Sequence, residues 1–337
     1  MTKNQVIQIG NETVNPGEWR VVMLPMPQLY DCSPMYMPIN VICGRQTGPV
    51  LLVTAAVHGD EINGVEIVRL LLKRKMLKYL RGTLIAIPIV NVYGFLYQSR
   101  YLMDRRDLNR SFPGSETGSL AARLANLLLQ EVIVKATHMI DLHTGSLHRT
   151  NVPQIRASLD NDENKKLAEV FGAPVILNSS ERDGSLRQAS SDIDLPFILY
   201  EAGEALRFSE VSIRTGLRGV TNVLRHLKMI PAAHYAKHHP ISSTFAYSSH
   251  WVRSTASGIL IPRKRLGDHV EENEKLGMIA NPFIKDEVEI LSPHSGIIIG
   301  KTNLPLVHEG EALFHIAIVE APQETSEQIS KLQNLSP

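Results

Sequence analysis

The strongest constraint on the fold of this 337-residue chain is the alternation of short apolar runs with longer amphipathic segments. Continuous apolar runs such as residues 50–57 are typical of strands that are buried on both faces of a sheet. The segments between them carry apolar residues at helical spacing. This alternation predicts an α/β domain with a mainly parallel or mixed sheet flanked by helices. Strands are expected at 50–57, 83–90, 138–143, 174–178 and 196–203, and helices at 65–80, 119–136, 159–172 and 210–229.

The pattern changes near residue 231, where a polar segment rich in His and Pro begins. From about 245 to 320 the chain contains short β-type runs separated by Gly, Pro and Asn, and the helical pattern is absent. These features predict a second, smaller all-β domain at 245–320. The polar composition of residues 321–337 predicts a flexible tail. The α/β domain is therefore expected at 1–235, with its core at about 40–230.

Composition excludes several classes of partner. The formal net charge is +1, so no global field attracts the chain to nucleic acid or to an anionic membrane. The two cysteines, Cys32 and Cys43, do not make a disulfide framework. The N-terminal residues lack the apolar stretch of a secretory signal, and no apolar run is long enough for a bilayer span. We therefore expect a cytoplasmic protein, with the question of a homo-oligomer left open.

Polar residues lie at the carboxyl ends of four of the predicted strands: His58, Asn91, His143 and Glu201. Ligands of open α/β sheets bind beyond the carboxyl ends of the strands, so these positions are candidates for one site. His58 and Glu61 are three residues apart and can converge on one ion if the chain turns between them. With His143, they would form the set of three protein ligands that is typical of catalytic zinc. The sequence thus predicts one Zn²⁺ per chain.

Two carboxylates near these ligands have predicted roles. Asp141 lies two residues before His143 and would orient an imidazole, or it is a buried carboxylate satisfied by backbone amides. Glu201 ends an apolar strand, a costly place for an acid unless it is paired or functional. We interpret Glu201 as the general base, with Glu204 as the rival and a capping or salt-bridged glutamate as the structural alternative.

A basic loop at residues 99–114 carries the candidate substrate ligands. Guanidinium groups bind carboxylates with two parallel hydrogen bonds, so the loop predicts a clamp for a small anionic substrate and a donor to the scissile carbonyl. The alternative is a solvated loop in which arginines, Arg106 above all, pair with Asp104 and Asp107. The candidates in this loop are Arg100, Arg105, Arg106, Arg110 and Asn109.

These motifs together resemble the succinylglutamate desuccinylase/aspartoacylase family of zinc carboxypeptidase-like proteins. The resemblance covers roughly residues 40–230 and implies a carboxypeptidase-like mixed sheet flanked by helices. The arginine loop fits the broad branch of the family better than either name-giving enzyme, which leaves the substrate open. The motifs are HGDE at 58–61, DLNRSFPG at 107–114, DLHTG at 141–145 and YEAG at 200–203.

The resemblance implies a role for each matching residue. Glu201 would be the catalytic acid and base, and Asn109 and Arg110 would bind the substrate carboxylate. Arg100 would polarise the carbonyl, with Arg105 as the alternative. The implied zinc ligands are His58, Glu61 and His143.

The C-terminal β segment has a resemblance of its own, to biotinyl/lipoyl-type domains. Lys285 lies eight residues before Pro293, near the place of a carrier lysine, but it lacks the flanking methionines that biotin attachment favours. We therefore interpret the segment as a structural domain that shapes one wall of the active-site mouth.

The predicted function is metal-dependent hydrolysis of the amide bond of a small N-acyl amino acid. A metallocarboxypeptidase acting on peptides or cell-wall fragments would use the same ligands and base. A non-catalytic zinc-bearing binding module is the third possibility, and the complete set of ligands and base argues against it.

Overall fold

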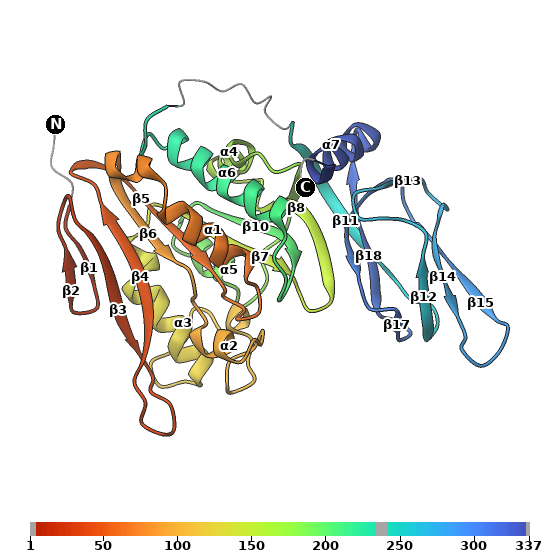
Figure 1. Cartoon of the computed structure of the whole chain (residues 1–337), viewed down its shortest axis with the longest axis horizontal. Helices are drawn as coiled ribbons and strands as arrows, with labels where there is room; N and C mark the ends of the chain where they lie inside the picture. The colour runs from red at the N-terminus through yellow and green to blue at the C-terminus, as the bar shows by residue number, and fades with distance from the viewer. Residues whose placement is uncertain (1–4, 233–241, 335–337) are drawn as a thin grey trace.

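The computed structural model describes residues 5–232 and 242–334, and its central element is a twelve-stranded mixed sheet (Figure 1). The polar segment that begins near residue 231 lies mostly outside the described residues. In sheet order the strands are β13 (His269–Val270), β16 (Gly296–Thr302), β18 (Ala312–Val319), β11 (Thr244–Arg253), β9 (Val175–Asn178), β8 (Arg149–Ala157), β10 (Phe197–Glu204), β7 (His138–Gly145), β5 (Gln46–Ala55), β6 (Arg81–Ile87), β4 (Met35–Cys43) and β3 (Trp19–Met26).

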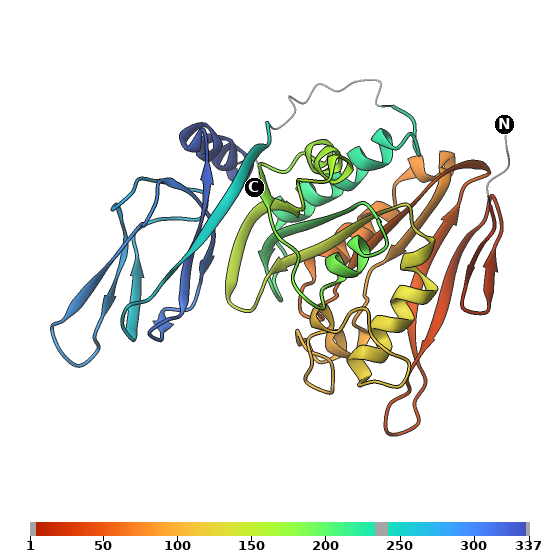
Figure 2. The same cartoon turned by 180° about the vertical axis from the view of Figure 1, so that it is seen from behind.

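Helices cover both faces of the N-terminal part of this sheet. The first layer contains α1 (Asn63–Leu72), α4 (Asp162–Phe171) and α6 (Glu210–His226), of which α1 and α6 lie in front in Figure 1. The second, seen in Figure 2, contains α3 (Leu120–Glu131) and α5 (Leu186–Ser191), beside the hairpin of β1 (Ile7–Ile9) and β2 (Glu12–Val14). Each layer packs apolar side chains on one face of the sheet, as an α/β domain requires. The predicted α/β class is confirmed.

The carboxyl ends of three adjacent parallel strands place the candidate residues together. Strand β7 lies between β5 and β10, and both neighbours run parallel to it. In this register Glu201 is the direct partner of His143. The HGDE turn follows β5 and leads into α1, so His58 and Glu61 lie at the same edge.

The C-terminal β strands continue the large sheet and also form a small sheet of their own. Strand β11 pairs in parallel with β9, and β16 pairs antiparallel with β8. The small antiparallel sheet contains β15 (Glu287–Leu291), β14 (Lys275–Ala280), β12 (Gly258–Pro262) and β17 (Leu306–Val307). The predicted smaller C-terminal β element is therefore present, joined to the α/β part by backbone pairing.

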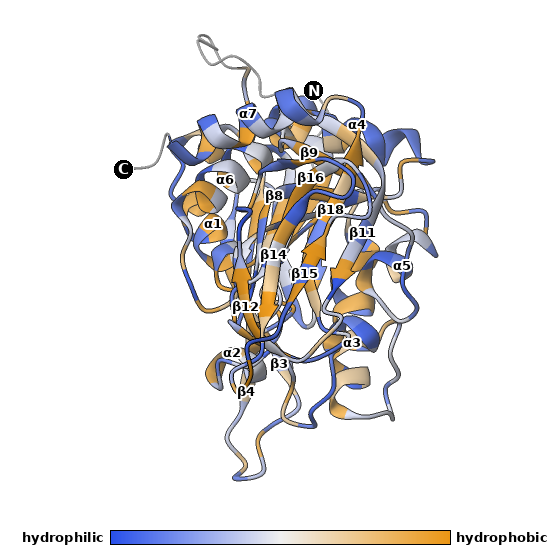
Figure 3. Cartoon of the chain, turned by 90° about the vertical axis from the view of Figure 1, so that its right-hand side faces the viewer, coloured by the Kyte–Doolittle hydropathy of each residue, from blue (hydrophilic) through white to orange (hydrophobic). Residues whose placement is uncertain are grey.

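The C-terminal segment differs from the prediction of a flexible tail. Residues Pro322–Asn334 form helix α7, which contacts β13 and β16. Its buried positions are Ile329 and Thr325, four residues apart on one side of the helix. Figure 3 shows α7 as largely hydrophilic next to hydrophobic strands, which is why composition alone predicted disorder. No helix in the described part of the chain is long and apolar enough to cross a membrane.

Candidate active site

The HGDE turn brings His58 and Glu61 into a tightly packed edge of the sheet. Both side chains are buried, at 3% and 1% exposure. The turn lies against α2 (Val92–Leu96): a Cβ on Gly59 would stand 2.0 Å from the carbonyl carbon of Gly94. Only glycine allows this approach, so the residue between the histidine and the two acids is dictated by backbone packing.

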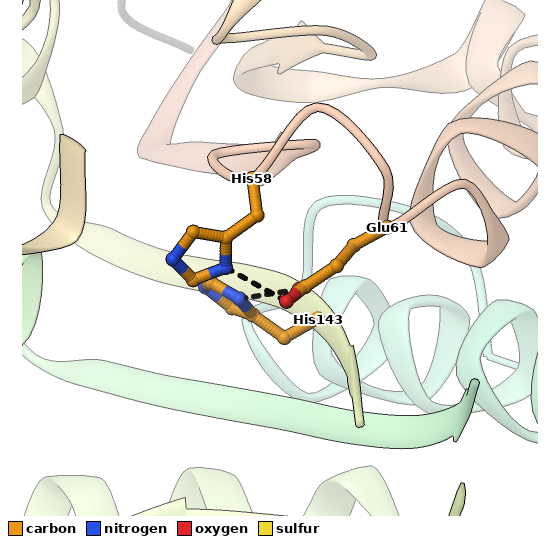
Figure 4. Close-up of side chains that lie close together, drawn as sticks. All are labelled: His58, Glu61 and His143. Atoms are coloured by element: carbon orange, nitrogen blue, oxygen red, sulfur yellow. Dashed lines mark hydrogen bonds and ion pairs between the residues drawn. The ribbon is translucent and has the colours of Figure 1, made fainter. Parts of the chain in front are cut away.

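The three predicted metal ligands converge, as Figure 4 shows. His58 Nδ1 is 2.8 Å from Glu61 Oε1, and His143 Nδ1 is 2.7 Å from Glu61 Oε2. One ligand atom from each residue lies within 4.8 Å of the other two, and all three residues are buried. Two imidazole nitrogens and one carboxylate oxygen in this arrangement are a donor set that fits a metal ion.

Each imidazole is held by an acid on its other nitrogen. His58 Nε2 is 3.1 Å from Asp107 Oδ1, and His143 Nε2 is 2.6 Å from Asp141 Oδ2. The hydroxyl of Thr54 donates to Asp141 Oδ1 at 2.7 Å. When each Nε2 carries the proton, both Nδ1 atoms offer lone pairs toward Glu61. Such outer contacts fix ring orientation and raise the basicity of the ligands. Asp141 thus contacts the imidazole of His143, and the contact of Asp107 with His58 was not among the sequence-based expectations.

The charges around the ligands compensate one another. Burial raises the pKa of the Glu61 carboxyl, but His58 and His143 outweigh burial, so this pKa lies well below its ordinary value. The pKa of Asp107 is lowered in the same way, against burial, by His58 and Arg100. Arg100 donates to Glu61 Oε1 at 3.2 Å and to Asp107 Oδ2 at 2.9 Å. Both acids therefore stay ionised.

Glu201 lies in strand β10 and lines the same cavity as the three ligands. Its Oε2 is paired with Nε of Arg156, which comes from the neighbouring strand β8. Glu204 is directed elsewhere: its Oε2 accepts from Asn303 at 2.9 Å, and the residue does not line the cavity. The geometry therefore favours Glu201 over Glu204 for the predicted base.

The arginine loop divides into residues that reach the cavity and residues that do not. Arg100, Asn109 and Arg110 line it. Asn109 Oδ1 accepts from the backbone N–H of Leu186 at 2.8 Å, which directs the amide and leaves its nitrogen as a donor. Arg105 is exposed and lies outside the lining, and Arg106 is an exposed partner of Asp104.

The cavity measures about 370 Å³, within the range typical of small-molecule sites. One wall is supplied by the C-terminal β strand β11, through Trp251 and Arg253, in agreement with the expectation that the β segment shapes the mouth of the site. Sequence analysis did not single out Arg253 or several other arginines of the cavity, because they come from segments without a motif. The other missed arginines are Arg149, Arg156, Arg182 and Arg187.

Comparisons with known proteins agree with the motifs. The family model described as the succinylglutamate desuccinylase/aspartoacylase catalytic domain matches residues 47–227, more than half of the chain. The N-alpha-acetyl-L-2,4-diaminobutyric acid deacetylase of Halomonas elongata is 26% identical over 297 residues, which are 84% of this chain and 86% of that protein.

Solved structures show the same fold. A succinylglutamate desuccinylase/aspartoacylase from Rhodobacter sphaeroides matches with a TM-score of 0.81 at 23% identity, covering 89% of this chain and 96% of that one. The product-bound ectoine utilization protein EutE from Ruegeria pomeroyi also gives a TM-score of 0.81, at 22% identity, covering 94% of this chain and 100% of that one. With the buried ligand set and the family match, the chain belongs to the succinylglutamate desuccinylase/aspartoacylase family and is a metal-binding amidohydrolase of the deacylase type.

Proposed function

We propose that this amidohydrolase is a zinc-dependent deacylase that cleaves the amide bond of a small N-acyl amino acid with a free carboxylate. The observation that carries the proposal is that the three metal ligands, Glu201 and Arg110 line one cavity. Metal, base and carboxylate ligand are the parts that this hydrolysis needs.

Zinc is the metal that the donor set fits best, because catalytic zinc takes imidazole nitrogen and carboxylate oxygen at three protein positions. His58, Glu61 and His143 would hold it. Zinc bound there would polarise the scissile carbonyl and lower the pKa of water to about 7. The paired acids Asp107 and Asp141 would keep both imidazoles in the orientation that binding requires.

Glu201 supplies the proton transfers in this scheme. It takes a proton from the water that attacks the carbonyl carbon and returns it to the nitrogen as the C–N bond breaks. The products are a carboxylic acid and a free amino acid. The ion pair with Arg156 fixes the position of the Glu201 carboxylate within the cavity.

Two cationic groups act on the substrate. Arg100 is held by Asp107 and Glu61 and would donate to the carbonyl oxygen as negative charge develops there. Asn109 and Arg110 would bind the free carboxylate, with the Asn109 amide directed by its contact with Leu186. Arg105 has no part in the scheme, since it does not line the cavity.

The Halomonas elongata relative supports an acylated amino acid as the substrate class, because its name specifies an N-acetyl diamino acid. The cavity of about 370 Å³ supports a small substrate over an extended peptide, which is the substrate of the metallocarboxypeptidase alternative. A binding module is disfavoured because a vestigial site has no need of a base.

The test compares N-acyl amino acids with peptides of two to five residues that have the same C-terminal residue. We expect kcat/KM for the N-acyl amino acids to exceed that for the longest peptides by tenfold or more. Equal or better turnover of the peptides would replace the proposal with the carboxypeptidase function. Zinc binding without turnover of either class would support the binding module.

A further inference from the structure

The end of the large sheet formed by β3 and β4 is covered by helices on one face only. Val22 and Leu24 of β3 are buried in the layer that contains α3. Val21 and Met23 lie on the opposite face of the same strand and are 48% and 43% exposed. In Figure 1, α1 and α6 lie in front of the middle of the sheet, and among the described elements no helix lies in front of β3 and β4. This end of the sheet therefore presents apolar side chains to the solvent.

The exposed face continues to two aromatic side chains. Trp19 begins β3, two residues before Val21 on the same face, and is 53% exposed. Tyr36 of β4 is the cross-strand partner of Pro25, which shares this face, and it is also exposed. Exposed apolar patches rimmed by polar groups mark contacts with proteins or membranes. We call these four residues the apolar stripe: Trp19, Val21, Met23 and Tyr36.

A groove of about 980 Å³ adjoins the apolar stripe, because Trp19 is one of its lining residues. Its other wall is the 3-10 helix η1 (Lys75–Tyr79), which follows α1. Among the described residues that line the groove, Glu18 is the one acid, and it is paired with Arg20 at 3.6 Å. The groove is otherwise strongly basic. We call its cationic residues the groove cations: Arg45, Lys73, Arg74, Lys75, Lys78 and Arg81.

Protein carboxylates do not neutralise the groove cations. Within residues 5–232 and 242–334, no carboxylate oxygen lies within 4.0 Å of any of the six. Arg69, one helical turn before the end of α1, is in contrast paired with Glu66 at 2.5 Å. Lys78 Nζ lies over the ring of Tyr79, 4.7 Å from its centroid. The formal net charge of the chain is only +1, so this is a local concentration of positive charge and not a global one.

The end of α1 does not account for this charge. Cations in the last turn of a helix are stabilised by the helix dipole, which is a structural reason for Lys73 at the C-cap of α1. Arg45, however, lies between β4 and β5, and Arg81 begins β6. Cations from three separate segments therefore meet in one groove beside an apolar surface.

An anionic phospholipid surface complements both features. Four to eight lysines and arginines close together are typical of segments that bind anionic headgroups. Tryptophan and tyrosine favour the boundary between headgroups and acyl chains. A second copy of the chain fits less well, since a two-fold axis through this face would bring the groove cations of both copies together.

We propose that the apolar stripe and the groove cations form a docking surface for an anionic phospholipid bilayer. Headgroups occupy the groove, and Trp19 lies at the level of the headgroups. The groove is at the amino ends of β5 and β6, whereas His58 follows the carboxyl end of β5. Docking through the groove therefore leaves the mouth of the active-site cavity open. This interaction is separate from the proposed deacylase activity and does not depend on it.

The first experiment is sedimentation of the full chain with vesicles. One set contains phosphatidylcholine alone, and the other contains phosphatidylcholine and phosphatidylserine in equal parts. We expect binding to the second set only, and its loss at high ionic strength, where charges near a surface are screened. Equal binding to both sets, or binding to neither, overturns the proposal.

The second experiment assigns the binding to the groove. The combined change Lys75→Gln, Lys78→Gln and Arg81→Gln should weaken binding to the anionic vesicles by about 100-fold, the expected effect of three charges near an anionic leaflet. An equal loss in the control variant would overturn the assignment. The control removes the same charge from three exposed residues of the C-terminal β region, each changed to Gln: Arg263, Arg265 and Lys285.

The third experiment follows the stripe through the fluorescence of Trp19. The chain has two tryptophans, so Trp251→Phe leaves Trp19 as the single reporter. Its emission should shift to shorter wavelengths on anionic vesicles, because the indole leaves water. Trp19→Ser should weaken binding about tenfold, and Trp19→Phe should recover part of the loss. Phe283→Ser, at an exposed site in the loop before β15, should change neither property. Vesicle binding without a shift would contradict the placement of Trp19.

Two further measurements test other occupants of the surface. Sedimentation velocity without vesicles would overturn the proposal if it showed a dimer that Trp19→Ser dissociates, because a second copy would then cover the stripe. Calorimetry with inorganic phosphate tests a soluble anion. Phosphate binding that the Lys75, Lys78 and Arg81 variant abolishes, in a protein that ignores vesicles, would replace the bilayer with a soluble anion. A monomer that binds anionic vesicles supports the proposal.

Discussion

The metal ligands and a group of four arginines line one cavity but differ in how far their charges are paired. We call the four residues the arginine cluster: Arg149, Arg156, Arg182 and Arg187. Around the ligands, two acids have cationic and imidazole partners: Glu61 contacts both histidines and Arg100, and Asp107 contacts His58 and Arg100. Within the cluster, Glu201 is the one paired carboxylate in the described part of the chain, and buried N–H groups of Arg149 and Arg187 lack acceptors.

This difference indicates what each group binds. A set of nitrogen and oxygen donors directed at one point, with their outer atoms already paired, is suited to a cation. A group of buried donors without acceptors is suited to an anion. In the proposed function, substrate bound in this cavity would place its amide at the metal and its free carboxylate on Asn109 and Arg110.

The largest effect is expected from removing a metal ligand. His143→Ala leaves two ligands of the three, so the protein should lose its zinc and its hydrolytic activity should fall below detection. Metal content per chain, measured by mass spectrometry, is the test, with His308→Ala in an exposed loop after β17 as the control. Full zinc occupancy in His143→Ala would show that the ligand set is wrong.

The next largest effect is expected at Glu201, the proposed general base, which lines the cavity with the metal ligands and pairs with Arg156 of the arginine cluster. Glu201→Gln should retain zinc and fold but lower kcat by about 100-fold or more, the scale of a lost general base. Glu204→Gln is the matched control, because Glu204 contacts Asn303 outside the cavity. Near-normal turnover in Glu201→Gln together with a large loss in Glu204→Gln would move the role to Glu204.

A smaller effect is expected at the carboxylate ligands. Arg110→Ala should lower kcat/KM for substrates with a free α-carboxylate by about tenfold to a hundredfold relative to their neutral amide analogues. Arg110→Lys should recover part of the loss, since lysine supplies charge without the planar fork. Equal losses on charged and neutral substrates would indicate a structural arginine.

The smallest effect is a pH dependence of the free energy of unfolding that comes from His315, whose ring stacks on Trp251. Burial, with the charges of Arg156, Arg182 and His250, lowers the pKa of His315 from 6.5 to about 3. The unfolded chain binds this proton at a higher pH than the folded protein. The contribution of His315 to stability is therefore fully present above pH 6.5 and is lost progressively as the pH drops from 6.5 toward 3. The slope from this one group is about 1.4 kcal/mol per pH unit.

His315→Phe should keep the stack on Trp251 and remove this slope, which chemical denaturation between pH 7 and pH 5 would measure. His308→Phe, at an exposed site, should leave the slope unchanged. An unchanged slope in His315→Phe would mean that another group carries the pH dependence.

The metal ligands could be predicted from sequence because they lie in short segments at strand ends. The apolar runs of β5, β7 and β10 marked the strands, and HGDE and DLHTG each carry ligands within a few residues. Parallel order then brings these ends together, as the pairing of Glu201 with His143 illustrates. The positions of the metal ligands could therefore be predicted from the apolar runs, together with the rule that ligands bind at the carboxyl ends of parallel strands.

The arginine cluster could not be predicted, because its members meet through tertiary structure. Strand β8 contains Pro153 and two arginines, so its sequence lacks the apolar run that marked the other strands. Its bulge appears only in the pairing with β10. The β segment was expected to shape one wall of the site, but nothing near Trp251 shows that β11 would join β9 or that this residue would line the cavity. The helix α7 was missed for a related reason, since Ile329 is its one fully buried apolar side chain.

The central claim is that a metal ion held by His58, Glu61 and His143 is required for amide hydrolysis in this cavity. The most direct measurement is the release of free amine from a panel of N-acyl amino acids by metal-stripped protein, before and after one equivalent of zinc is added. The account predicts no release without metal, recovery with zinc, and no recovery in His143→Ala. Equal release by the stripped and the zinc-loaded protein would contradict it.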